Sequence, residues 1–93
     1  MSRAERMKAT LEEVFHPAAL QIEDESRRHA NHAGRNGLEA GETHYKVTMV
    51  AAAFAGLNRV ARQRAVNEVL AGEFAGGMHA LSLTLRAPEE AAP

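Results

Sequence analysis

Five histidines are the residues of this 93-residue chain whose chemistry is easiest to interpret, and they are His16, His29, His32, His44 and His79. Neutral imidazole is the commonest metal ligand in proteins, and it titrates near physiological pH. The chain has no cysteine, so it cannot build a disulfide, a thiolate nucleophile or an all-cysteine zinc or iron–sulfur site. Imidazole is therefore the ligand type of most interest in this chain, and any thiolate at a shared metal site would come from another molecule.

His79 has the sequence setting that most favours a ligand role. It follows Gly76-Gly77 closely and is in phase with Leu81, Leu83 and Leu85, as in a strand with one apolar face. A histidine on such a face is usually a core residue with a backbone partner. At the start of the strand, however, the ring would lie at the rim of the core, where a metal can reach it.

The sequence settings of the other four histidines are weaker indications of metal binding. His29 and His32 form a pair three positions apart in the polar, glycine-bearing stretch 26–42, which is also typical of a long mobile loop. Two such rings could chelate a metal, but the loop offers nothing rigid to orient them. His44 is predicted on the outer face of a strand, as a solvated or supporting residue, and His16 as a surface or capping residue. Two imidazoles are too few for a closed tetrahedral site, so a partner would have to complete it.

The elements that position these residues follow from periodicity and from turn residues. We expect a helix over 2–15 that starts at Ser2 and is ended by Pro17, and another from Asn58 to Gly76 that is open to a break into two. Strands are predicted at 19–24, 43–52 and 78–86, with a frayed tail at 87–93. The order αββααβ predicts an α+β fold, with helices on one face of a small mixed sheet whose second and third strands pair in parallel. The whole chain, 1–93, is expected to be one domain.

Composition narrows the function. The chain is 45% hydrophobic, 25% charged and 4% aromatic, with a formal charge of −1. These values are typical of a globular domain. The net charge disfavours a domain specialised for binding polyanions, and the low aromatic content disfavours one that binds single strands by stacking on their bases. No apolar run reaches the ~20 residues of a membrane span, and the start of the chain does not resemble a secretory signal, so we expect no membrane association and a cytoplasmic location. We also find no nucleophile–base pair and no acid/base dyad, and expect no enzyme activity.

Taken together, these segments resemble the BolA family over about residues 8–88. The similarity is carried by Asp24-Glu25-Ser26-x-x-His29, Thr43-His44-Tyr45-Lys46-Val47, Phe54-Ala55-Gly56-Leu57, Arg62-x-Arg64-x-Val66-x-x-x-Leu70 and Met78-His79-Ala80-Leu81-Ser82. Each motif is weak by itself, but the set in this order and spacing is specific. The resemblance implies a class II KH-like fold without a GxxG loop, in agreement with the order derived above.

The resemblance also implies a partner and a cofactor. BolA-like proteins pair with monothiol CGFS-type glutaredoxins and share a [2Fe-2S] cluster with them, in iron–sulfur cluster trafficking or iron and redox regulation. The glutaredoxin cysteine and a bound glutathione supply thiolates, and the BolA-like chain supplies imidazole. The family's C-terminal strand histidine falls on His79, and in the subgroup with a histidine in the loop the second ligand falls on His29, with His32 or His44 as competitors. The isolated apo protein, expected as a monomer or weak homodimer, would hold no cluster.

The helix that starts at Asn58 is the basis of an alternative function. Its arginines Arg59, Arg62 and Arg64 could contact a partner or DNA, as in a stress-response transcription regulator, or simply form a solvated face. The family usually has Arg-His-Arg here, whereas this chain has Gln63 in the middle. Glutamine can donate and accept a hydrogen bond but carries no charge, so the family's histidine at this position is interpreted as structural.

Overall fold

The computed structural model describes residues 2–25 and 43–91. In chain order the elements are α1 (Arg3–Phe15), β1 (Ala19–Asp24), β2 (His44–Val50), the 3-10 turn η1 (Ala52–Phe54), α3 (Arg59–Val69), α4 (Ala71–Ala75), β3 (Ala80–Arg86) and α5 (Pro88–Ala91). The predicted loop 26–42 and the last two residues of the predicted tail lie outside the described residues. Among the described residues, no helix is both long and apolar enough to cross a membrane.

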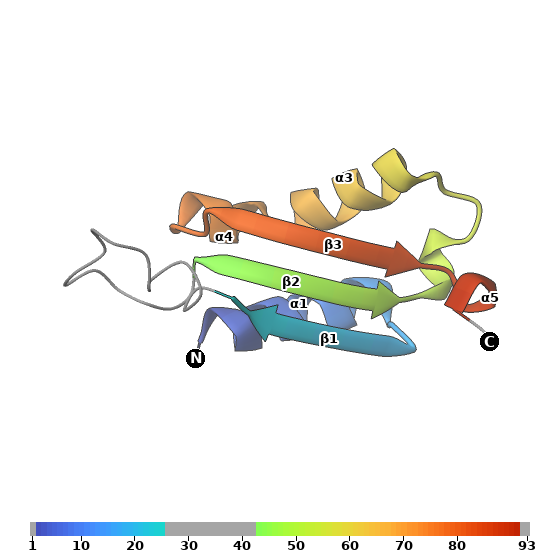
Figure 1. Cartoon of the computed structure of the whole chain (residues 1–93), viewed down its shortest axis with the longest axis horizontal. Helices are drawn as coiled ribbons and strands as arrows, with labels where there is room; N and C mark the ends of the chain where they lie inside the picture. Colours follow the sequence, from blue (N-terminus) through green and yellow to red (C-terminus); the bar gives the residue numbers. More distant parts are fainter. Residues whose placement is uncertain (1, 26–42, 92–93) are drawn as a thin grey trace.

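The sheet has the strand order β1-β2-β3. β1 pairs with β2 antiparallel, with Leu20 opposite Met49, and β2 pairs with β3 parallel, with Val47 opposite Leu83. Figure 1 shows the helices α1 and α3 on the same face of this sheet, and no helix within residues 2–25 and 43–91 covers the other face. The predicted α+β arrangement, with a mixed sheet and a helical crossover from β2 to β3, is confirmed.

Local capping signals define both long helices. The Ser2 side chain accepts from the backbone N–H of Glu5, and the Glu5 carboxylate accepts from the backbone N–H of Ser2. This reciprocal capping box satisfies donors that the first helical turn leaves unpaired. Asn58 caps α3 in a similar way by accepting from the N–H of Ala61. At the other end of α1, His16 adopts a left-handed conformation and donates its backbone N–H to Glu12, so its predicted capping role is confirmed.

The core lies between the sheet and the helices. Tyr45, Val47 and Met49 alternate with polar residues in the sequence, which predicts that they share one buried face of a strand, and the structure buries all three on β2. The residues packed on them come from α1, η1, α3 and the segment before β3. Those residues are Met7, Leu11, Phe54, Val66, Leu70 and Met78. Burial of apolar side chains is the main stabilising contribution in a domain of this size.

Two predictions about the second half of the chain need correction. At 100° per residue Val60 and Phe74 share one helical face with Val66 and Leu70, and this spacing predicts that all four are buried. Val60 and Phe74 are instead 57% and 37% exposed. The helix breaks at Leu70, so only the central part that carries Val66 and Leu70 lies over the sheet. In addition, residues 88–91 form α5 where a frayed tail was predicted, because the Glu90 carboxylate accepts from the N–H of Ala87 and caps this turn.

Candidate functional site

His79 lies directly before β3, at the end of the sheet where β2 also begins. Its backbone N–H donates to the carbonyl oxygen of Thr43 at 2.8 Å, and the N–H of Ala80 donates to the same oxygen at 3.1 Å. The side chain of His79 is exposed, whereas the preceding Met78 is buried in the core. The backbone at His79 is therefore fixed to the sheet while the imidazole faces solvent, which is a more exposed position than the sequence predicted.

His44 stands beside His79. The two ring centroids are 5.9 Å apart and the rings meet edge to face, at 76°. The pairing of β2 with β3 causes this, because His44 is opposite Ala80 in the parallel register. The Thr43 hydroxyl lies 2.9 Å from Nδ1 of His44 and helps to fix the orientation of this ring. The structure thus brings together two of the predicted candidate ligands, one exposed and one partly buried.

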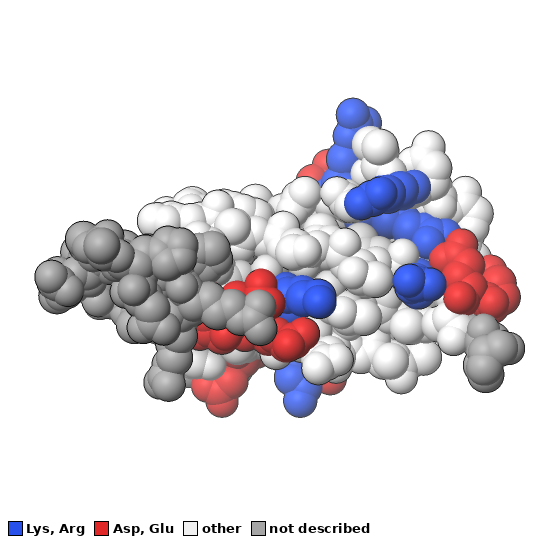
Figure 2. Space-filling model, in the orientation of Figure 1, with Lys and Arg blue, Asp and Glu red and all other residues white. Residues whose placement is uncertain are grey.

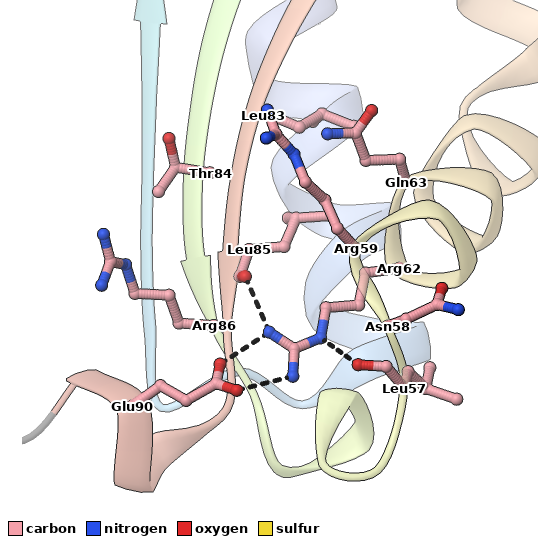
Figure 3. Close-up of a pocket in the computed structure, with 10 residues that line it drawn as sticks. All are labelled: Leu57, Asn58, Arg59, Arg62, Gln63, Leu83, Thr84, Leu85, Arg86 and Glu90. Carbon is pink, nitrogen blue, oxygen red and sulfur yellow. Dashed lines mark hydrogen bonds and ion pairs between the residues drawn. The ribbon is translucent and has the colours of Figure 1, made fainter.

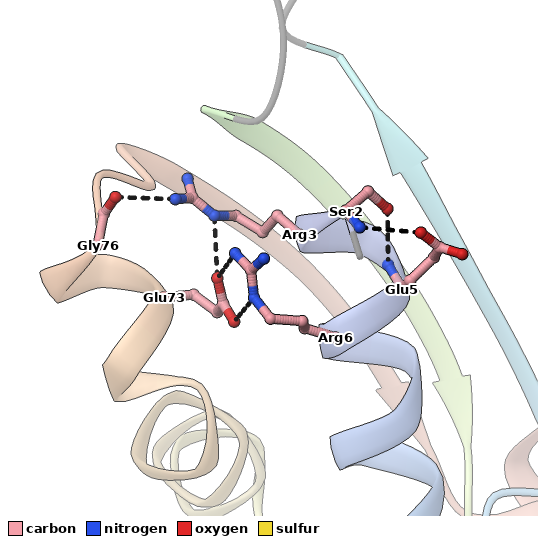
Figure 4. A network of polar contacts seen from close by, with 6 residues as sticks. All are labelled: Ser2, Arg3, Glu5, Arg6, Glu73 and Gly76. Atoms are coloured by element: carbon pink, nitrogen blue, oxygen red, sulfur yellow. Dashed lines mark hydrogen bonds and ion pairs between the residues drawn. The ribbon is translucent and has the colours of Figure 1, made fainter.

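A network of arginines and one carboxylate holds the segment that leads to His79 (Figure 4). Glu73 of α4 accepts from Nε of Arg3 at 2.9 Å, and from Nε and Nη2 of Arg6 at 3.0 and 2.9 Å. Nη2 of Arg3 also donates to the carbonyl of Gly76 at 2.9 Å. The start of α1 is thereby joined to the end of α4, three residues before His79.

The same turn depends on glycine. Gly77 has φ of +118°, a conformation that side chains with a Cβ rarely adopt. The N–H of Met78 then donates to the carbonyl of Glu73, which closes the turn and places Met78 in the core. Hydrogen bonds from the arginines, Arg6 first, together with their positive charge, lower the pKa of the Glu73 carboxyl below its usual value. Glu73 is therefore ionised at neutral pH, as a carboxylate bound by two guanidinium groups should be.

Two of the predicted ligand residues, His29 and His32, lie outside the described residues. His16 is at the C-terminus of α1, where its role is the helix cap already described. Within the described residues, no group of three or more histidine, cysteine, aspartate or glutamate side chains is arranged to hold a metal ion. The described part of the chain therefore offers the imidazole pair His44 and His79, and further ligands must come from elsewhere.

The predicted arginines separate into different environments. The Arg62 side chain is 12% exposed, and its guanidinium donates to the carbonyl oxygens of Leu57 and Leu85 and to both carboxylate oxygens of Glu90 (Figure 3). Hydrogen bonds from Arg62, then from the N–H of Ala87, lower the pKa of Glu90 to about 2. Arg59 and Arg64 are exposed on α3. Of the alternatives open for these arginines, the solvated face does not describe Arg62, which links α3, β3 and α5.

A groove of about 650 Å³ opens at this arginine end of the sheet. Arg59, Arg62 and Gln63 line it from α3, and Leu83, Leu85 and Arg86 line it from β3. Figure 2 shows arginine side chains gathered over α3 and the end of β3, next to the acidic side chains of α5. Sequence reasoning missed this groove because the contributions of Arg86 and Glu90 depend on how β3 and α5 pack.

Comparison with known proteins agrees with the resemblance seen in the sequence. Residues 11–90 match the family described as BolA-like protein. A solved structure of BolA1 from Arabidopsis thaliana superposes with a TM-score of 0.88 and 41% identity, covering 99% of this chain and 98% of that one. The chain is 43% identical to the chloroplastic protein BOLA1 of Arabidopsis thaliana over 96% of its own length and 56% of the relative.

One bacterial relative is named for a function in transcription. The DNA-binding transcriptional regulator BolA of Vibrio cholerae is 42% identical over 78% of this chain and 63% of the relative. The chain therefore spans a little over half the length of the two relatives named here. These matches show its family and its fold.

Proposed function

Because the chain belongs to the BolA-like protein family, we propose that it is a non-enzymatic partner of a monothiol CGFS-type glutaredoxin and helps to bind a bridging [2Fe-2S] cluster. One observation carries this proposal: the exposed imidazole of His79 stands beside His44 at one end of the sheet. The role would be in iron–sulfur cluster trafficking or in iron and redox regulation.

The donor groups of the chain fit such a shared cluster. The sequence contains no cysteine, so this chain offers no thiolate, and the thiolates would come from the glutaredoxin and its glutathione. The described residues provide two imidazoles at one end of the sheet. Two ligands are too few for a metal site formed by this chain alone, but they suit a site that a partner completes at an interface. When bound, the cluster would supply one-electron chemistry, at a higher potential than with thiolate ligands alone, as in Rieske centres.

The chain's own residues would present and orient the imidazole. The backbone bond from His79 to Thr43 fixes the position of the ligand residue, and the Gly77 turn and the Arg3–Glu73 contact fix the segment before it. A ligating imidazole must be neutral, so protons compete with the metal for any imidazole ligand. This would make the shared site pH-sensitive, which suits transfer or sensing better than permanent electron storage.

The second cluster ligand from this chain would be either a histidine of the stretch 26–42 or His44 of the sheet. The resemblance points to His29, with His32 as its neighbour, whereas His44 is the imidazole that lies next to His79 among the described residues. His44 would bind the cluster directly, or it would support the ring of His79 from the side. Comparison of three single variants, His29→Ala, His32→Ala and His44→Ala, distinguishes these roles.

Visible absorption and circular dichroism test the proposal directly. Cluster-loaded CGFS glutaredoxin is titrated with this protein, and we expect a changed cluster spectrum with wild type and no change with His79→Ala. The matched control is His16→Asn, which removes an imidazole at a helix end and keeps a residue that tolerates the left-handed backbone there. An unchanged spectrum with the wild-type protein would refute cluster binding by this chain.

Nucleic-acid binding is the alternative function, since one relative is named a DNA-binding transcriptional regulator. Arg59 and Arg64 are exposed and could contact phosphates, whereas Arg62 is already paired with Glu90. The chain's net charge of −1 disfavours tight binding to a polyanion. DNA affinity measured against salt concentration tests the alternative, which requires a steep loss of affinity with salt and a weaker interaction for Arg64→Glu.

A further inference from the structure

The arginine groove at the far end of the sheet from His79 has features that the cluster role does not use. We propose that this groove binds an extended acidic peptide segment of a partner protein, which adds to the free edge of β3 and displaces Glu90 from Arg62. The proposal does not depend on cluster binding, because its residues lie at the opposite end of β3.

Glu90 shows that the groove is built to hold a carboxylate. Its Oε1 accepts from Nη1 of Arg62 at 2.6 Å and from the backbone N–H of Ala87 at 2.9 Å, and its Oε2 accepts from Nη2 of Arg62 at 2.9 Å. A guanidinium that forms two parallel bonds to a carboxylate is a specific recognition geometry. The occupant, however, comes from a four-residue helix near the end of the chain, where the carboxylate is 44% exposed. The Glu90 carboxylate is thus held by a short, exposed helix and not by the core, so an external carboxylate that reaches Arg62 could take its place.

The charge of the groove exceeds what Glu90 neutralises. Arg59, Arg62 and Arg86 line it, and Glu90 is the single carboxylate among its lining residues. Within the described part of the chain, no ion pair to Arg59 or Arg86 is found. A ligand with more than one negative charge could therefore use Arg59 and Arg86 in addition to Arg62. This complementarity indicates an acidic occupant.

The backbone of β3 indicates that the occupant is an extended peptide. β3 is an edge strand, and its Arg86 carbonyl accepts from Ala51 beside the end of β2, so Leu83 and Leu85 direct their backbone groups outward. Arg62 confirms this direction, because it donates to the Leu85 carbonyl from outside the sheet. No described residue pairs with the outward N–H and C=O of Leu83, which leaves them to pair with an added strand.

The arrangement of the arginines matches an added strand. Figure 3 shows Arg59 on the helix side of β3 and Arg86 on the opposite side, with Arg62 and Glu90 between them at the end of the groove. Successive side chains of an extended peptide point to opposite faces of the sheet. Acidic residues on both faces of the added strand would therefore meet Arg59 on one side and Arg86 on the other. A nucleic-acid backbone has no comparable alternation.

Fluorescence anisotropy with the full-length protein tests the proposal, using a labelled ten-residue peptide of glutamate and valine with glutamates on both faces. Glu90→Gln removes the negative charge that competes for Arg62, and we expect it to tighten binding about three- to five-fold. The matched control, Glu89→Gln, removes the same charge from the same helix but breaks no hydrogen bond to Arg62, and it should change affinity by less than about 1.5-fold. Arg59→Gln and Arg86→Gln should each weaken binding about three-fold, whereas Arg64→Gln, a charge outside the groove, should have little effect.

Two further probes identify the ligand class. A peptide with the same side chains but N-methylated backbone amides cannot add to the strand edge, and we expect it to lose most of its affinity. A single-stranded oligonucleotide of equal charge should bind more weakly than the peptide and should not respond to Glu90→Gln. The proposal is overturned if Glu89→Gln acts as strongly as Glu90→Gln, if N-methylation has no effect, or if the oligonucleotide binds more tightly through the same arginines.

Discussion

The carboxylate of Glu73 offers the sharpest test of how the histidine end of the sheet is held. Glu73→Gln keeps the shape and one acceptor oxygen but removes the charge that binds Arg3 and Arg6. The bond from Arg3 is well shielded, because the Arg3 and Glu73 side chains are 10% and 16% exposed. The bonds from Arg6 count for less, because that side chain is 43% exposed.

The magnitude follows from these exposures. A hydrogen bond to a charged group contributes roughly 1.5–3 kcal/mol when shielded, and an exposed ion pair contributes roughly 0.2–1 kcal/mol. Since glutamine retains one acceptor, we expect a loss of about 2 kcal/mol in the free energy of unfolding. For a domain of this size that corresponds to a melting temperature lower by roughly 10 °C.

Urea unfolding followed by far-UV circular dichroism measures this change. Glu68→Gln is the matched control, because it removes the same charge from an exposed position on α3 and should change stability by less than about 0.5 kcal/mol. A double-mutant cycle with Arg6→Gln then isolates the coupling of Glu73 to the exposed arginine. If Glu73→Gln is as stable as Glu68→Gln, the network does not stabilise the fold and the reasoning is refuted.

Three further predictions concern acid stability, the turn and the core. The arginine partners of Glu73 lower the pKa of its carboxyl, so Glu73 stabilises the fold above the ordinary carboxyl pKa of 4.5 and this stabilisation is lost as the pH falls below that value. The free energy of unfolding should therefore differ less between pH 5 and pH 3 for Glu73→Gln than for the wild type. Gly77→Ala introduces a Cβ at φ of +118° and should cost about 1–3 kcal/mol in urea unfolding, while Gly72→Ala, in a helix with open space around it, should not destabilise. Phe54→Ala empties a fully buried site and should cost about 3–5 kcal/mol by the same assay, against less than about 1 kcal/mol for Leu57→Ala, which is 39% exposed.

The features that could be predicted from the sequence are those with local causes. The capping roles of Ser2 and Asn58 act over three residues, and the alternation of Tyr45, Val47 and Met49 follows from the two-residue period of a strand. The parallel pairing of β2 and β3 followed from the helix between them. These signals were sufficient for the α+β fold.

The features that escaped prediction depend on residues far apart in the chain. Arg3 and Glu73 are 70 positions apart, and Arg62 and Glu90 are 28 apart, so no periodicity connects them. The contact between His44 and His79 needs the exact register of β2 and β3, which the alternation of each strand does not specify. The strand pairing was predictable, but the partner of the key histidine was not.

The two ends of β3 should act independently, because the length of the strand keeps the two sites far apart. His79 precedes β3 and Arg86 ends it, and seven residues of extended chain span roughly 20 Å. Charges at that separation are screened at physiological ionic strength, and substitutions so far apart are usually additive. We therefore expect His79→Ala to leave the affinity for the acidic peptide within about two-fold of wild type, and Arg59→Gln to leave the cluster spectrum unchanged. A larger effect of either substitution on the other end would show that one partner contacts both ends of the strand, or that β3 shifts as a unit when either end is occupied.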